Sequence, residues 1–208
     1  LNYGKKILKN AGIAEADLDS WYLFEEIFGI SRAQYFLCAR ENIVGSTAQK
    51  MTAQEQTGNS LESKNALDCV ELWLKEKLSA YEHALKKRAA RIPMQQIIGQ
   101  QEFMGLSFFV NEHVLIPRQD TETLVERVLR DYPEKDLKLL DMCTGSGCIA
   151  ISLAVMGGYR DVTAADLSEA ALKVAAENAD HLLQERRKEG CRFTLRRGDL
   201  FEALKPGE

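Results

Sequence analysis

The chain has 208 residues, a length that fits one large domain or two small ones with a substantial core. Hydrophobic residues make up 45% and charged residues 28% of it, and the formal net charge of -4 argues against a nucleic-acid backbone as the main partner. No apolar stretch reaches the roughly 20 residues that cross a bilayer, so the composition indicates a soluble protein without a membrane partner.

Cysteine and histidine usage indicates the cellular compartment and bears on whether the protein has a metal site. The five cysteines contain no Cys-x-x-Cys pair, which is typical of a reducing cytosol, so we predict a cytoplasmic protein. The three histidines lie far apart and lack the spacing of metal ligands, so we predict no metal site. The chain begins at Leu1 without a targeting segment, and we expect it to be part of a longer protein.

Apolar residues at helical spacing predict a small all-helical domain over residues 1–92. A first pattern ends at Gly29 and has Asp19 or Ser20 as its start, and a short helix follows it. Residues 45–65 are polar and predict a mobile connection or a weakly packed helix. From residue 67 to residue 85 the apolar positions step by three and four, which predicts one long amphipathic helix.

The pattern then changes to a β-hairpin linker over residues 93–118. Three short β-like runs are separated by glycine and asparagine: 96–98, 106–110 and 114–116. After the linker, Asp120 or Thr121 can cap a helix that ends before Pro133.

Residues 119–208 carry alternating strands and helices. The predicted strands are 137–142, 162–165 and 193–196, and the helices between them are 146–156 and 168–189. Such alternation predicts an α/β fold, namely the first half of a doubly wound parallel sheet with helices on both faces.

The first strand enters a tight turn of small residues, Cys143-Thr144-Gly145-Ser146-Gly147, and an acid, Asp166, ends the second strand. In doubly wound sheets ligands bind outside the carboxyl ends of the strands, and glycine lets backbone N–H groups approach an anion. Asp166 is placed to accept hydrogen bonds from ribose hydroxyls. The pattern therefore predicts a site for a cofactor that contains a nucleoside.

The third strand ends at a second candidate position, Asp199-Leu200. A carboxylate there can bind the exocyclic amine of an adenine while the leucine covers the ring, or Asp199 can instead cap the next short helix. The run from Gly145 to Ala150 also satisfies the dinucleotide pattern G-x-G-x-x-A, so local spacing leaves NAD open as the cofactor.

Three stretches together resemble the bacterial release-factor glutamine methyltransferases, which use S-adenosylmethionine. They are Ile116–Glu122, Leu140–Ala150 and Gly198–Phe201, and the first is the most specific to the family. The resemblance implies a Rossmann-like methyltransferase domain, a helical domain that docks the substrate, and N5-methylation of a glutamine side chain in a peptide chain release factor.

The chain also departs from the family pattern. Cys143 stands where the family often has a first glycine, and we expect it to fit because the turn needs a negative φ there; Gln119 stands where a second proline is common. The family's Asn-Pro-Pro-Tyr motif, which holds the substrate amide, is not found up to Glu208. The resemblance thus implies no catalytic residue in this stretch, and a fragment that is inactive alone.

The residues leave three further hypotheses. An amino-methyltransferase acting on nucleic acid shares the glycine turn, and an NAD-dependent dehydrogenase shares its spacing. A non-catalytic binding module would use the helical part and keep the α/β part as a scaffold. We also expect the first strand, without later strands beside it, to present an exposed apolar edge that favours association.

Overall fold

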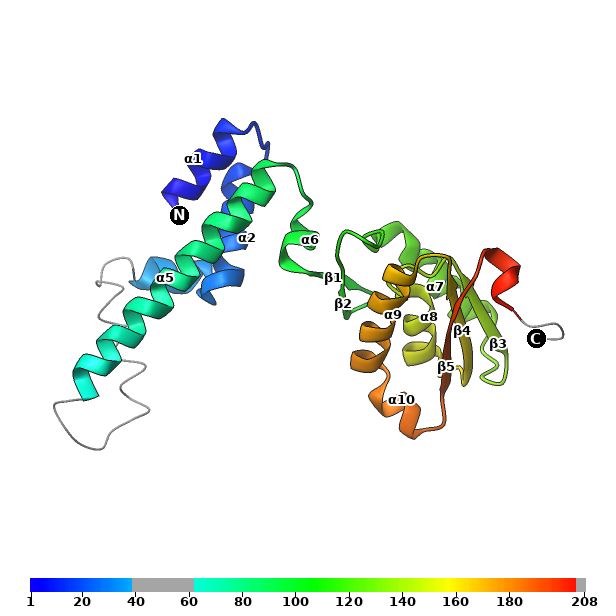
Figure 1. Ribbon diagram of the computed structural model, residues 1–208. Coiled ribbons are helices and arrows are strands. Elements are labelled where there is room, and N and C mark those ends of the chain that lie inside the picture. Colours follow the sequence, from blue (N-terminus) through cyan, green and yellow to red (C-terminus); the bar gives the residue numbers. More distant parts are fainter. Residues whose placement is uncertain (39–61, 205–208) are drawn as a thin grey trace. The chain divides into compact units, whose positions relative to one another are not determined.

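The computed structural model describes residues 1–38 and 62–204, and the chain divides into two compact units (Figure 1). We call Leu1–Ile98 the helical unit and Gly99–Glu208 the α/β unit. Each has its own cluster of buried hydrophobic residues. The polar segment at 45–65 lies outside the described residues except for its end, which begins a helix. Within the described ranges, no helix combines the length and the apolar character needed to cross a membrane.

The helical unit confirms the predicted periodicity. Its helices are α1 (Asn2–Asn10), α2 (Ala16–Phe28), α3 (Arg32–Cys38), α5 (Glu62–Ala89) and α6 (Met94–Ile98). Helix α5 is the predicted long amphipathic helix, and α2 ends at Gly29, whose φ of 66° is the left-handed value that glycine adopts at low cost.

Two local predictions in this unit are wrong. Asp19 and Ser20 lie inside α2 and not at its start, because both are needed in the interior: Asp19 accepts a hydrogen bond from Arg88 at 2.7 Å, and the Ser20 hydroxyl lies 2.7 Å from the Tyr81 hydroxyl. Residues 96–98 form part of helix α6 and not a strand; the Pro93 carbonyl accepts the backbone N–H groups of its first turn.

The α/β unit begins with a β-hairpin of β1 (Gln100–Phe103) and β2 (Leu106–Phe109), paired antiparallel. Met104 and Gly105 form its two-residue turn with φ values of 53° and 72°, the signature of a type I′ turn. The predicted hairpin is therefore confirmed, although its first strand lies a few residues later than the 96–98 run, and residues 114–116 form no strand.

Three parallel strands follow in the order β3-β4-β5. They are β3 (Lys138–Met142), β4 (Asp161–Asp166) and β5 (Arg192–Arg197). The helical segments around them are α7 (Gln119–Asp131), α8 (Cys148–Ser152), the π-helix η1 (Leu153–Gly157), α9 (Glu169–Leu182), α10 (Gln184–Lys188) and the 3₁₀ turn η2 (Leu200–Ala203). This order confirms the first half of a Rossmann-like parallel sheet.

The core of the α/β unit lies on one face of this sheet. Val125 of α7, Ile151 of α8 and Ala179 of α9 belong to the same buried cluster as Val162 and Ala164 of β4. The prediction of helices on both faces is thus met on one face only within the described residues. On the other face Leu140 is 41% exposed. In the same residues β3 pairs with β4 alone, so its outer edge is open, as predicted; association through that edge stays a prediction.

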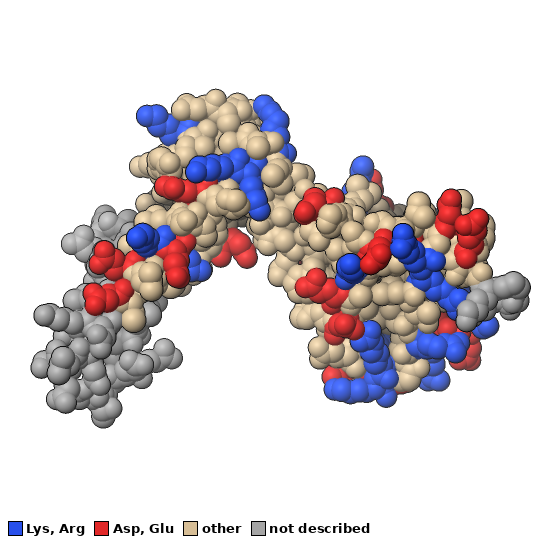
Figure 2. Space-filling model, in the orientation of Figure 1, with Lys and Arg blue, Asp and Glu red and all other residues tan. Residues whose placement is uncertain are grey.

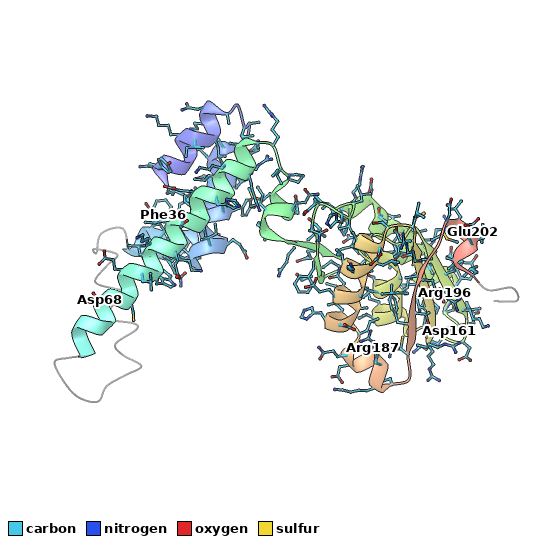
Figure 3. All side chains as sticks on the ribbon, viewed as in Figure 1. Phe36, Asp68, Asp161, Arg187, Arg196 and Glu202 are labelled. Carbon is cyan, nitrogen blue, oxygen red and sulfur yellow. The ribbon has the colours of Figure 1, made fainter. Side chains whose placement is uncertain are left out.

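Charged side chains of both signs alternate over the α/β unit (Figure 2). On α10 the basic residues are paired with acids nearby: Arg187 binds Asp180, Arg186 binds Glu189 and Lys188 binds Glu185. Figure 3 labels Arg187 on this helix. These ion pairs neutralise the basic cluster locally, so it behaves as an ordinary solvated helix surface.

Candidate functional site

The turn from Cys143 to Gly147, called the glycine turn below, lies at the carboxyl edge of the sheet between β3 and α8. The Thr144 N–H donates to the Ala165 carbonyl of β4 at 2.9 Å, and the Gly147 N–H donates to the Thr144 carbonyl at 2.9 Å. Two backbone bonds therefore close the turn and hold it against the end of the neighbouring strand.

Asp166 lies at the end of β4 and binds this turn directly. One of its oxygens, Oδ2, accepts the Gly145 N–H at 2.9 Å, and the other, Oδ1, accepts the Ser168 N–H at 2.9 Å. An ionised carboxylate offers about four acceptor positions. Two of them remain, which is the number that the two hydroxyls of a ribose need.

The two glycines of the turn face different surroundings. A Cβ added to Gly145, whose φ is +56°, would meet nothing within 4 Å. A Cβ added to Gly147, whose φ is +81°, would come 2.9 Å from Ile151 Cδ1 and 3.3 Å from Ala175 Cβ. Gly147 is thus required by packing against α8 and α9, whereas Gly145 borders open space on the side where a ligand can approach.

The expectation of a negative φ at Cys143 is wrong. Its φ is +62°, in the left-handed region, and its side chain is exposed. A side chain there brings Cβ close to the neighbouring carbonyl and costs roughly 1–2 kcal/mol. This is the physical reason why a glycine suits the position.

Thr144 and Ser146 point into the protein and not toward solvent. Thr144 is 6% exposed and Ser146 is 2% exposed. The Thr144 hydroxyl donates to Asp141 Oδ2 at 2.6 Å, while the Ser146 Oγ is buried. The predicted contact of these two residues with a cofactor therefore rests on their backbone groups.

Asp141 is a site residue that the sequence analysis missed. Besides Thr144, its Oδ2 accepts the Ala150 N–H of α8 at 3.3 Å, so one carboxylate connects both ends of the turn. Burial raises the pKa of Asp141, and the nearby charge of Asp166 raises it further, against the hydrogen bonds from Thr144 and Ala150. Its position near the end of an apolar strand, two residues before the glycine turn, is the signal that identifies it.

Asp199 and Leu200 follow β5 at the same edge of the sheet. The Gly198 N–H donates to the Asp166 carbonyl at 3.2 Å, which joins this segment to the end of β4. Asp199 is the N-cap residue of η2, but its side chain makes no capping hydrogen bond. Leu200 is 54% exposed, with a φ of 46°. The carboxylate and the apolar side chain are therefore both free to meet a ligand.

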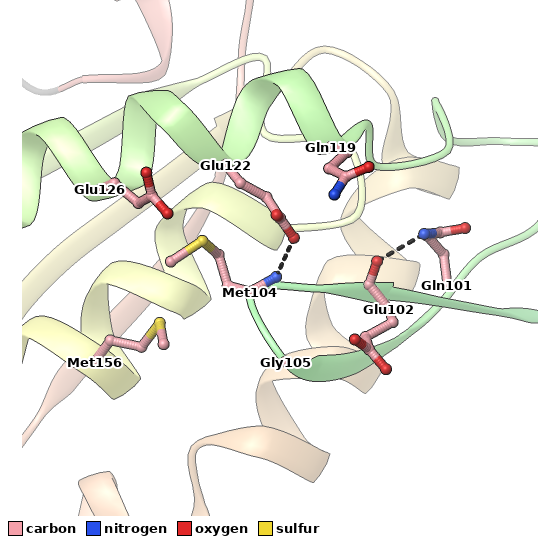
Figure 4. A pocket seen from close by; sticks show the side chains of 8 residues that line it. All are labelled: Gln101, Glu102, Met104, Gly105, Gln119, Glu122, Glu126 and Met156. Carbon is pink, nitrogen blue, oxygen red and sulfur yellow. Dashed lines mark hydrogen bonds between the residues drawn. The ribbon is translucent and has the colours of Figure 1, made fainter.

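A separate hollow of about 480 Å³ lies between the hairpin turn and α7 (Figure 4). Glutamate side chains line it, and Glu122 Oε1 accepts the Met104 N–H at 2.6 Å. The predicted site residues are not among those that line it. Glu122, from the family-specific stretch before α7, thus holds the hairpin turn.

Two family models match the chain. The PrmC N-terminal domain matches residues 1–55, and the Ribosomal protein L11 methyltransferase (PrmA) model matches residues 119–188. The first covers the start of the helical unit, and the second covers α7 to α10, including the glycine turn.

Similar curated proteins are named release factor glutamine methyltransferase. The Geobacter sulfurreducens protein is 43% identical over 129 residues, which cover 62% of this chain and 43% of that protein. The Enterococcus faecalis protein is 52% identical over 90 residues, covering 43% and 32%, and the Streptococcus pneumoniae protein is 40% identical over 134 residues, covering 64% and 46%. The resemblance predicted from the sequence is confirmed.

The matched part of the chain spans less than half of the length of each of these relatives. Among solved structures, a Pyrococcus abyssi tRNA (uracil-54, C5)-methyltransferase in complex with S-adenosyl-L-homocysteine aligns with 48% of this chain and 23% of its own, at 19% identity. The TM-score of this alignment is 0.36.

Proposed function

We propose that the chain is the cofactor-binding and substrate-docking part of a cytoplasmic enzyme that transfers methyl groups from S-adenosylmethionine to a glutamine side chain of a peptide chain release factor. The cofactor would be held by Cys143, Thr144, Gly145, Ser146, Gly147 and Asp166, and by Asp199 and Leu200 at its adenine end.

One observation carries the cofactor assignment: Gly145 borders open space while its own N–H is bound to Asp166. The backbone of the turn can therefore approach a ligand from one side, with the ribose-binding carboxylate already fixed beside it. Relatives named release factor glutamine methyltransferase, 40% to 52% identical to this chain, support methyl transfer as the reaction.

The names of the relatives support S-adenosylmethionine over NAD as the cofactor, because these proteins are named release factor glutamine methyltransferase. No observation favours the dehydrogenase or a nucleic-acid substrate.

When bound, S-adenosylmethionine supplies a methyl group on a positively charged sulfur. Such a transfer needs alignment of the acceptor nitrogen with the methyl group more than it needs acid or base catalysis. The residues of this chain would contribute by fixing the nucleoside at Asp166 and the amino-acid end at the turn. We propose no residue of this chain as the group that positions the acceptor amide.

The helical unit would dock the release factor. Two observations support this role: residues 1–55 match the PrmC N-terminal domain, and the helical unit has its own core. Removal of residues 1–98 from the full-length product of the gene should leave binding of S-adenosylhomocysteine unchanged and abolish methylation of the release factor. Unchanged methylation would refute the docking role.

Titration calorimetry of the chain with S-adenosylhomocysteine and with NAD tests the cofactor. We expect the native chain to bind S-adenosylhomocysteine and not NAD. In Gly145→Ala the affinity for S-adenosylhomocysteine should be at least roughly tenfold lower, because the new Cβ would occupy the open side of the turn. Gly190→Ala is the matched control: Gly190 has a φ of +89° and also open space around it, but lies before β5 at the other edge of the sheet. Equal losses in both variants, or binding of NAD alone, would refute the assignment.

A further inference from the structure

Asn178 is a fully buried polar residue in the middle of α9, at 0% exposure. Its side-chain Oδ1 accepts the Phe109 N–H at 2.7 Å, and its Nδ2 donates to the Phe109 carbonyl at 3.0 Å and to the Ser146 carbonyl at 2.9 Å. One amide therefore binds the end of the hairpin, 69 residues earlier, and the glycine turn, 32 residues earlier.

Other residues of α9 also contact either the hairpin exit or the glycine turn. Ala171 and Val174, two turns and one turn before Asn178, pack with Val110 and Val114, which follow the hairpin. Ala175 lies against Gly147 so closely that a Cβ there would be 3.3 Å away. Helix α9 is thus in contact with the hairpin exit and with the glycine turn, and Asn178 is its hydrogen-bonded link to both.

We propose that Asn178 is a positioning residue that couples the order of the hairpin to the conformation of the glycine turn. Because its amide satisfies polar groups of both segments at once, displacement of either leaves a buried group without a partner. Coupling of this kind is reciprocal, so a ligand that orders the turn also orders the hairpin. That the ligand is a methyl donor rests on the proposed function; the coupling itself does not.

Amide hydrogen exchange of the ligand-free chain tests the coupling. In Asn178→Leu, which keeps the branched shape and the number of heavy atoms and removes every side-chain hydrogen bond, we expect exchange about tenfold faster at the Phe109 N–H and also at the Thr144 and Gly147 N–H groups of the turn. Val162→Ala, a buried β4 variant, controls for general loss of stability and should not accelerate these amides selectively. Faster exchange at Phe109 with an unchanged turn would overturn the proposal.

Asn178→Asp is the second variant and distinguishes a bonding role from a space-filling role. It keeps an acceptor for the Phe109 N–H, but it has no N–H group to donate to the Phe109 and Ser146 carbonyls. We expect Phe109 to stay more protected than in Asn178→Leu while the turn amides exchange as fast as they do there. If the leucine variant protects all of these amides as well as the native asparagine does, Asn178 only fills space and the proposal fails.

Addition of S-adenosylhomocysteine gives the second readout. In the native chain it should slow exchange at Phe109 and Val110 severalfold, and in Asn178→Leu this effect should be lost while the turn is still protected. If the ligand protects the hairpin equally in both, Asn178 is not the link. If the native chain binds no S-adenosylhomocysteine, the proposed function fails, and the ligand-free exchange alone decides the coupling.

Discussion

Cys143 carries a side chain in a backbone conformation that favours glycine, with a φ of +62°. Replacement by glycine removes the roughly 1–2 kcal/mol of left-handed strain and adds about 0.5–1 kcal/mol of unfolded-state entropy. We therefore expect Cys143→Gly to raise the free energy of unfolding by about 0.5–1 kcal/mol, measured by urea denaturation. Cys143→Ala is the control, since it removes the thiol and keeps the Cβ; an equal gain there would show that the thiol and not the backbone is responsible.

Asp141 gives the stability of the chain a pH dependence. Burial raises its pKa in the folded state, so the folded protein binds this proton more tightly than the unfolded chain does. The resulting stabilisation is complete below the unfolded-state pKa of about 3.9 and is lost as pH rises through the raised folded-state value.

Asp141→Asn keeps an oxygen acceptor for Thr144 and Ala150 but cannot titrate. The free energy of unfolding of this variant, relative to the native chain, should therefore shift in its favour as pH rises from about 4 toward neutrality. Urea denaturation at a series of pH values measures the difference. Parallel pH profiles for the two proteins would mean that burial does not raise the pKa of this carboxyl.

At the scale of elements, α7 and the hairpin are joined through one side chain. Glu122 accepts the Met104 N–H at 2.6 Å, at a turn that already requires a positive φ at Met104. Hydrogen bonds to charged groups contribute about 1.5–3 kcal/mol. Glu122→Ala should therefore lower the free energy of unfolding of the α/β unit by about 1–2 kcal/mol and speed exchange at the Met104 amide.

A neighbour on the same helix provides the control for this prediction. Glu126 lies one turn later and lines the same hollow, but it is exposed and does not bind the Met104 N–H. Glu126→Ala should leave the Met104 amide unchanged, and Glu122→Gln, which keeps an oxygen acceptor, should lie between the two. Equal effects of both alanine variants would indicate a general charge effect in place of the hydrogen bond.

Elements with a long period or a clear terminator were predictable from the sequence. Helix α5 repeats its apolar positions over several turns, and Gly29 ends α2 in the conformation that glycine permits. The helix at 96–98 was not predictable from the sequence, because three residues are too few to separate a strand from a helix. Pro93 before them starts a helix.

The candidate site was predictable only in part for a similar reason. The glycine turn and Asp166 follow from the order strand, turn, helix, strand and acid. The contacts of Asn178 join residues 69 and 32 positions apart, which no local pattern reports. The positive φ at Cys143 does not follow from its residue type, because a small side chain does not reveal strain; the glycine common at this position in the family is the signal for it.

At the scale of the whole molecule, the two units have separate cores and should unfold in separate transitions. Leu85 of α5 and Leu183 after α9 are both 0% exposed, one in the core of each unit. Replacing a fully buried leucine by alanine typically costs about 2–5 kcal/mol, so the two alanine variants make a matched pair.

The optical signals separate the units as well, because both tryptophans, Trp21 and Trp73, lie in the helical unit. Leu85→Ala should lower the denaturation midpoint followed by tryptophan fluorescence. Leu183→Ala should leave that midpoint unchanged and lower the midpoint of the remaining transition followed by circular dichroism. If each variant shifted both signals equally, the two cores would unfold as one cooperative structure, and the helical unit could not act as an independent docking part.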